Sequence, residues 1–157
     1  MNLHSTSNKK REKTDFTYPA NVKFECDRCG LCCGDTKHKT RHILLLETEA
    51  QKIASNTSRP IADFAAEIGD RLPYVYEMKK TSEGRCIHLK GGECSTYPLR
   101  PMICRFYPFE LKFDDAKGLY SFDFTLECPG INQGGVCCEK DFKKLFKLAK
   151  ERLGSFG

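Results

Sequence analysis

The stretch that decides the fold is CDRCGLCCGD, residues 26–35, which carries four cysteines within eight positions. Gly30 and Gly34 interrupt it, so we expect a loop rather than a helix or a strand. In a C-x-x-C loop the chain curls, so that both thiols converge on one point and backbone N–H groups can face the sulfurs. The stretch therefore predicts a site for metal ions or iron-sulfur clusters, with disulfides and reactive thiols as the alternatives.

The spacing within this loop is C-x2-C-x2-C-C. Cys26, Cys29 and Cys32 match the first three ligands of the bacterial ferredoxin run, but the x3 gap and the proline that follow in that run are absent. A fourth ligand must therefore come from elsewhere. Neighbouring side chains in an extended segment point to opposite faces, so Cys32 and Cys33 cannot easily serve one tetrahedral ion. Either two metal centres share the loop or one thiol is left free.

More thiols follow downstream, and with those of the loop they make eight, which is two sets of four. The additional cysteines are Cys86, Cys94, Cys104 and Cys128. Cys104 lies in YPLRPMICRFYPF, residues 97–109, where three prolines stiffen the backbone around it. A rigid backbone loses less entropy when its thiol binds a metal.

Composition narrows the class of protein. The chain has 157 residues and ten cysteines, and it begins with a polar, basic stretch that lacks the apolar core of a secretory signal. We therefore expect a cytoplasmic protein, in which stable disulfides are unusual and dense cysteines indicate metal or redox chemistry. We expect no membrane association, because the longest apolar run is ILLL, residues 43–46.

The formal net charge of +5 counts every cysteine as a neutral thiol. Eight thiolates holding two dications would reduce it to about +1. The basic character is thus weak evidence for nucleic acid, and we expect no nucleic-acid partner. The lysines of the last segment are expected to form a solvated helix face, although they could also dock an acidic partner.

The sequence predicts one α+β domain with short antiparallel hairpins and about three helices, organised around the cysteine-ligated sites. Residues 1–15 are predicted to be a flexible polar tail and residues 16–157 the metal-binding domain. Helices are expected from Thr48 to about Ser55, from after Pro60 to an end between Gly69 and Pro73, and from about Glu139 to Leu153. Hairpins are expected to pair 74–78 with 85–89, and 108–113 with 119–124. Short strands are expected at 22–24 and 42–46.

Four motifs together resemble a known family. They are CDRCGLCC, GRCIHL, CSTYPLRPMICRFYPF and CPGI, and they look like the YkgJ-type cysteine-cluster family, also called CxxCxxCC, over roughly residues 24–134. The resemblance implies eight metal-ligating cysteines, which are Cys26, Cys29, Cys32, Cys33, Cys86, Cys94, Cys104 and Cys128. The family includes flagellin lysine N-methylases, so the resemblance also implies a redox, electron-transfer or methyl-transfer-associated role beside a partner protein. Iron-sulfur clusters are the first expectation, and structural zinc in an interaction module is the alternative.

Side chains other than the thiols are also candidates for the site. Arg100 and Arg105 flank Cys104 and are expected to donate hydrogen bonds near the thiolates and to offset their charge, the alternative being pairs with surface carboxylates. His88 could ligate a metal, but eight thiols are already available. Cys137 and Cys138 lie beyond the motifs and are expected to be ordinary thiols, unless one replaces a ligand. We find no catalytic constellation outside the cysteines.

Overall fold

The computed structural model describes residues 16–154, and the predicted tail, residues 1–15, lies outside them. Within this range the chain forms three α-helices and four small sheets, the α+β class expected from the sequence. None of the helices in this range is long and apolar enough to cross a membrane. Two hydrophobic clusters form the core, and the cysteine-bearing segments lie among short elements connected to both.

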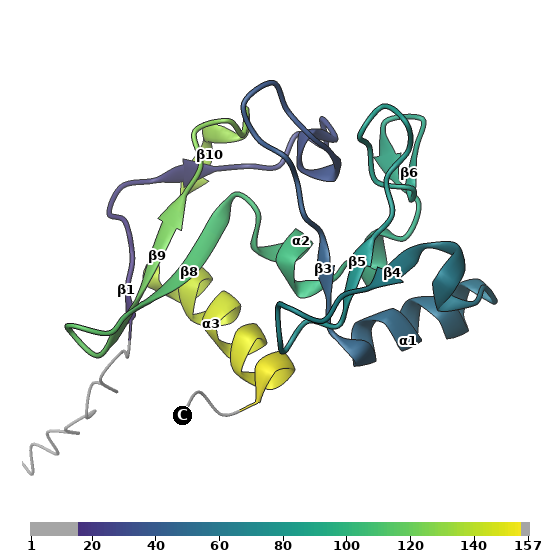
Figure 1. Ribbon diagram of the computed structural model, residues 1–157. Helices are drawn as coiled ribbons and strands as arrows, with labels where there is room; N and C mark the ends of the chain where they lie inside the picture. Colours follow the sequence, from purple (N-terminus) through teal and green to yellow (C-terminus); the bar gives the residue numbers. More distant parts are fainter. Residues whose placement is uncertain (1–15, 155–157) are drawn as a thin grey trace, which may run out of the picture.

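The first cluster lies between a three-stranded sheet and the last helix. The sheet has the order β1-β9-β8 and consists of β1 (Phe16–Thr17), β8 (Phe109–Asp114) and β9 (Leu119–Phe124). The predicted hairpin is confirmed, because β8 and β9 pair along their whole length. The helix α3 (Glu139–Leu153) lies beside this hairpin (Figure 1) and buries Phe142, Phe146 and Ala149. The Phe142 ring contacts Phe109 and Phe122, with centroid distances of 5.1 Å in both cases.

The second cluster lies between another three-stranded sheet and the first helix. The sheet has the order β3-β5-β4 and consists of β3 (Leu44–Leu45), β4 (Ala65–Glu67) and β5 (Tyr76–Met78). The helix α1 (Glu47–Thr57) packs Ala50 and Ile53 onto this sheet, where both are fully buried. The predicted helix is confirmed, but it begins earlier: Glu49 rather than Gln51 accepts the capping hydrogen bond, from the N–H of Leu46.

The helix predicted to follow Pro60 is wrong. The chain makes a 3-10 helix, η2 (Ile61–Asp63), and then enters strand β4, whose residues pair with β5. The apolar residues that suggested a helical face are still buried, since Phe64 and Ala65 are 0% and 3% exposed. A short isolated helix is only marginally stable, so the hydrogen bonds offered by β5 decide the conformation.

The hairpin predicted from 74–78 and 85–89 is confirmed only near its turn. Beyond the turn, β5 pairs with β3 and β4 instead. The two arms meet through the isolated bridge Lys80↔Cys86 and the hydrogen bond from Ile87 N to Lys79 O, 3.0 Å long. This turn nevertheless places Cys86 in the second hydrophobic cluster.

The remaining elements are short, and most of them carry or flank cysteines. They are β2 (Lys23–Phe24), η1 (Leu31–Cys33), β6 (Leu89–Lys90), β7 (Glu93–Cys94), η3 (Tyr97–Leu99), α2 (Met102–Phe106) and β10 (Ile131–Val136). β2 pairs with β10, and β6 pairs with β7. Elements of two to six residues bury little surface on their own, so contacts between them determine where the thiols lie.

A buried carboxylate joins the two clusters. Glu49 of α1 is 4% exposed, and its Oε2 accepts hydrogen bonds from the N–H of Met102, 2.6 Å away, and from Arg152 of α3, 2.7 Å away. Its other oxygen caps α1 by accepting from Leu46 N. One side chain therefore holds together the three α-helices of residues 16–154.

Candidate metal centre

A small cavity of about 100 Å³ brings most of the predicted ligands together. Six of the eight line it: Cys26, Cys32, Cys33, Cys86, Cys94 and Cys104. These residues come from the cysteine loop, the turn before β6, strand β7 and helix α2. The fold thus brings cysteines that are up to 78 residues apart in the sequence to the wall of one cavity.

The cysteine loop is joined to the turn that carries Cys86 by backbone hydrogen bonds. The N–H of Cys86 donates to Cys33 O over 2.5 Å, and the N–H of Asp35 donates to Gly84 O over 2.9 Å. Gly34 forms a bridge with Arg85 between these contacts, and a Cβ at Gly34 would meet the Arg85 side chain at 2.7 Å. This close approach places Cys33 beside Cys86.

The other end of the cysteine loop is joined to the segment that carries Cys128. The N–H of Glu25 donates to Gly130 O over 3.1 Å, and Phe24 of β2 pairs with Ile131 of β10. The Cys128 thiol lies close enough to Cys26 and Cys29 for their charges to raise its pKa, although burial is the larger cause. Cys26 and Cys29 are thus the thiols whose charges act on Cys128.

Backbone N–H groups lie near two of these sulfurs. Burial raises the pKa of the Cys86 thiol, and the nearby N–H groups of His88 and Leu89 act in the opposite direction, although the Leu89 N–H donates its hydrogen bond to Cys86 O over 3.0 Å. Burial likewise raises the pKa of Cys128, and the N–H groups of Gly130 and Ile131 oppose this. N–H donors two and three residues after a cysteine stabilise a thiolate, which is the ligand form of this residue. The motifs CIHL and CPGI thus place N–H groups beside thiols whose pKa burial nevertheless keeps raised.

The adjacent cysteines of the loop differ in their surroundings. Their Sγ atoms lie 3.9 Å apart on the 3-10 helix η1. The hydrogen bond from Cys33 lowers the pKa of Cys32, and the positive charges of Arg41 and Arg100 act in the same direction. The same hydrogen bond raises the pKa of Cys33, together with burial and the charges of Cys104 and Cys86. Cys33 thus belongs electrostatically with Cys86 and Cys104.

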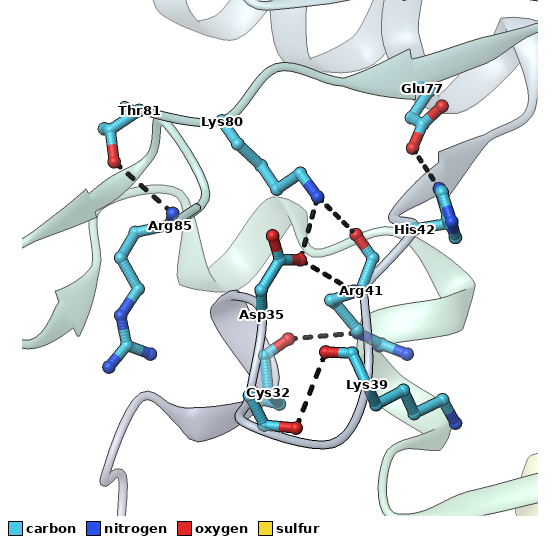
Figure 2. A network of polar contacts seen from close by, with 10 residues as sticks. Cys32, Asp35, Lys39, Arg41, His42, Glu77, Lys80, Thr81 and Arg85 are labelled. Atoms are coloured by element: carbon cyan, nitrogen blue, oxygen red, sulfur yellow. Dashed lines mark hydrogen bonds and ion pairs between the residues drawn. The ribbon is translucent and has the colours of Figure 1, made fainter. Parts of the chain in front are cut away.

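Arg41 is a charged neighbour of the thiols that sequence reasoning missed. Its Nε donates to Cys32 O over 3.1 Å, and its terminal nitrogen lies 3.5 Å from Ile103 O, next to Cys104. Figure 2 shows how its backbone is fixed. Asp35 accepts from Arg41 N and from Lys80 Nζ, both over 2.8 Å, and Lys80 also donates to Arg41 O. Arg41 lies in a polar stretch, and only the folded chain reveals its contacts.

The two arginines predicted beside the thiols occupy different places. Arg100 lines the cavity, and its guanidinium lies 3.7 Å from the centre of the Tyr97 ring. Arg105 donates instead to the carbonyl oxygens of Arg100 and Pro98, over 3.0 Å in both cases. Arg105 therefore braces the segment before α2. For both residues, an influence on a bound metal stays a prediction.

The remaining candidates lie at the margins of the site or outside it. His88 lines the cavity and is 4% exposed. Cys137 is partly buried near Phe24, whose N–H faces its sulfur, and Cys138 is exposed at the start of α3. Neither of this last pair lines the thiol cavity. Their role as replacement ligands stays untested.

Within residues 16–154, no three His, Cys, Asp or Glu side chains are arranged closely enough to hold a metal ion as they stand. The donor chemistry nevertheless fits one: six cysteines and one imidazole line the cavity, and backbone N–H groups lie near the Cys86 sulfur. Thiolate sets of this kind select zinc or iron-sulfur clusters over magnesium and calcium. The site therefore defines a domain of the thiolate metal-binding class.

Comparison with known proteins agrees with this class. Residues 25–129 match the CxxCxxCC family model, described as "Putative zinc- or iron-chelating domain", and the chain belongs to this family. The resemblance stated from the motifs is thus confirmed, and Cys137 and Cys138 lie outside the matched region. The chain is also 28% identical, over 151 residues, to the uncharacterized protein MJ0661 of Methanocaldococcus jannaschii, with 92% of this chain and 79% of that protein covered. No solved structure is significantly similar.

Proposed function

We propose that this protein binds two iron-sulfur clusters through its eight predicted ligands and uses them in electron transfer, in redox sensing or in support of a methyl-transfer enzyme. The observation that carries the proposal is the convergence of six of these thiols on one cavity. Metal binding follows from the family, and the identity and number of the centres are our proposal. A cytoplasmic location, where thiols stay reduced, belongs to the same proposal.

We assign the eight cysteines to two groups of four. The first group comprises Cys33, Cys86, Cys94 and Cys104, which affect one another's pKa values, although the charge of Cys32 also raises the pKa of Cys86 and Cys104. The second comprises Cys26, Cys29, Cys32 and Cys128, which are linked in the same way. This division puts the adjacent residues Cys32 and Cys33 in different groups, which resolves the geometric conflict of two neighbouring side chains serving one tetrahedral centre.

Two features favour iron-sulfur clusters. Cys26, Cys29 and Cys32 keep the ferredoxin spacing, and N–H groups facing cysteine sulfurs are among the means by which proteins tune cluster potentials. When bound, such clusters supply one-electron chemistry. Cys26 and Cys29 are exposed, so a centre in the second group would lie where a partner protein can exchange electrons with it.

Structural zinc in an interaction module is the second candidate. It is favoured by the shortness of the elements around the thiols, since β2, β6 and β7 have two residues each. A domain with such short elements gains stability from metal crosslinks that replace part of a conventional core. In this case the zinc would only stabilise the fold, and the protein surface would bind a partner.

Anaerobic purification followed by metal and acid-labile sulfide analysis and a visible spectrum separates these candidates. We expect a coloured protein with iron and sulfide. A colourless protein with two zinc ions would overturn the cluster proposal in favour of zinc. Protein without metal, with all thiols freely alkylated, would contradict both. Cys86→Ser is expected to lose metal, and Cys137→Ser serves as the matched control that keeps it.

A further inference from the structure

The Nε2 atom of His88 is buried without a hydrogen-bond partner, and it is the one side-chain nitrogen or oxygen of residues 16–154 in this condition. The His88 side chain is well enclosed, as the residue is 4% exposed. A buried polar atom left unpaired costs about 1–3 kcal/mol, so native proteins rarely retain one without a reason.

The imidazole is fixed in place and has no acceptor among its charged neighbours. Its ring packs against Phe64 with 5.5 Å between the ring centroids. The His88 carbonyl accepts from both the N–H and the hydroxyl of Ser95, over 2.8 and 2.7 Å. The charges acting on the ring belong to Arg59 and Lys90, which only donate hydrogen bonds.

His88 lines the cavity that brings together the first group of thiols, with Cys26 and Cys32 of the second group on the same wall. Its own backbone N–H lies near the sulfur of Cys86 and opposes the rise that burial causes in the pKa of that thiol. Four thiolates complete the tetrahedral shell of a metal ion, and the sulfur atoms then remain as hydrogen-bond acceptors. A donor on the cavity wall therefore finds its partner in the bound group rather than in the protein.

We propose that the Nε2–H of His88 donates a hydrogen bond to a sulfur atom of the inorganic group bound by Cys33, Cys86, Cys94 and Cys104. The inference rests on the proposed function of this site. His88 is then a positioning residue and not a ligand: it holds the sulfur shell and stabilises its negative charge. Loss of such a partner lowers metal affinity by about 10- to 100-fold.

The test uses Co²⁺ as the probe on reduced, metal-free, full-length protein under anaerobic conditions. Affinity is measured by competition with a chelator for the wild type, His88→Leu and His88→Gln. Gln keeps an N–H donor near the position of Nε2, whereas Leu removes it. We expect His88→Leu to lose affinity by about 10- to 100-fold and His88→Gln to retain most of it. The Co²⁺ absorption spectrum should stay that of an all-thiolate site in all three.

Three results would overturn the inference: equal affinity in all three proteins, an equal loss in both variants, or a spectrum that shows a nitrogen ligand in the wild type alone. His88→Met repeats the comparison if the Leu variant does not fold. Failure of the proposed function looks different. A zinc protein would be colourless and free of sulfide after anaerobic purification while the Co²⁺ comparison still held, and without a metal site the wild type would bind no Co²⁺ and Cys86→Ser would behave like it.

Discussion

At the residue scale, Gly130 determines how closely the Cys128 segment approaches the cysteine loop. A Cβ at this position would collide with the carbonyl oxygen of Glu25. We predict that Gly130→Ala pushes the two segments apart and lowers the metal content of the second thiol group. Metal analysis of the anaerobically purified variant checks this.

Gly135→Ala is the matched control. This glycine lies in the same strand, β10, and a Cβ there would meet nothing within 4 Å. Its metal content should equal that of the wild type. If Gly130→Ala also binds metal normally, the approach of the two segments does not matter for binding.

Sequence reasoning identified the cysteines and missed the residues that act through the fold. The thiols of residues 26–33 can be recognised as candidate ligands from their spacing, because ligands of one centre must lie close together. Arg41 and Glu49 carry no such signal. Each of them contacts partners that are distant in the sequence, Ile103 for Arg41 and Arg152 for Glu49. Such pairs become visible only when the chain is folded.

At the element scale, helix α3 begins with an acidic cap. Asp141 accepts hydrogen bonds from the N–H of Cys138, 2.9 Å away, and from its thiol, 3.3 Å away, and these lower the pKa of Asp141. A carboxylate whose pKa is lower in the folded than in the unfolded protein stabilises the fold at pH values above its unfolded-state pKa. This contribution is lost as the pH falls through the folded-state pKa.

We therefore predict that Asp141→Asn destabilises the protein at pH 7 by about 0.5–1 kcal/mol and that the difference from the wild type shrinks in acid. Urea unfolding at neutral and acidic pH measures it. Asp115→Asn, in the exposed turn between β8 and β9, is the control and should change little at either pH. A difference that grows in acid would contradict the role of Asp141.

Elements were predictable where their pattern was long and complete. The helix at 139–153 carries a complete apolar face, and the hairpin of β8 and β9 combines aromatic and charged residues on two strands of six residues each. The region of Ile61 to Ile68 offered only four apolar positions, which suit a helix by spacing. Strand β5 lies beside it and supplies backbone partners, for example between Ala65 and Met78, so tertiary pairing overrides the local pattern.

At the scale of the whole molecule, Glu49 connects the two hydrophobic clusters. Its ion pair with Arg152 is largely buried, with side-chain exposures of 2% and 24%. We predict that Glu49→Ala lowers the free energy of unfolding by about 3–5 kcal/mol, because Arg152 loses its partner and the N–H of Met102 loses its acceptor. Urea denaturation followed by circular dichroism checks this.

Glu47→Ala provides the comparison, since Glu47 lies on the exposed side of the same helix. Glu47→Ala should change the free energy of unfolding by no more than about 0.5 kcal/mol. Similar losses of unfolding free energy in the two variants would show that the contacts of the Glu49 carboxylate do not stabilise the packing of the two clusters.

The 3-10 helix Leu31–Cys33 has a consequence for assembly, because its adjacent thiols are assigned to separate centres. Once one inorganic group immobilises Cys32, the backbone of Cys33 is already ordered and the next group pays less conformational entropy. Uptake should therefore be cooperative. Native mass spectrometry during reconstitution should show empty and fully loaded chains at half-saturation, and abundant half-loaded chains would mean that the neighbours fill independently.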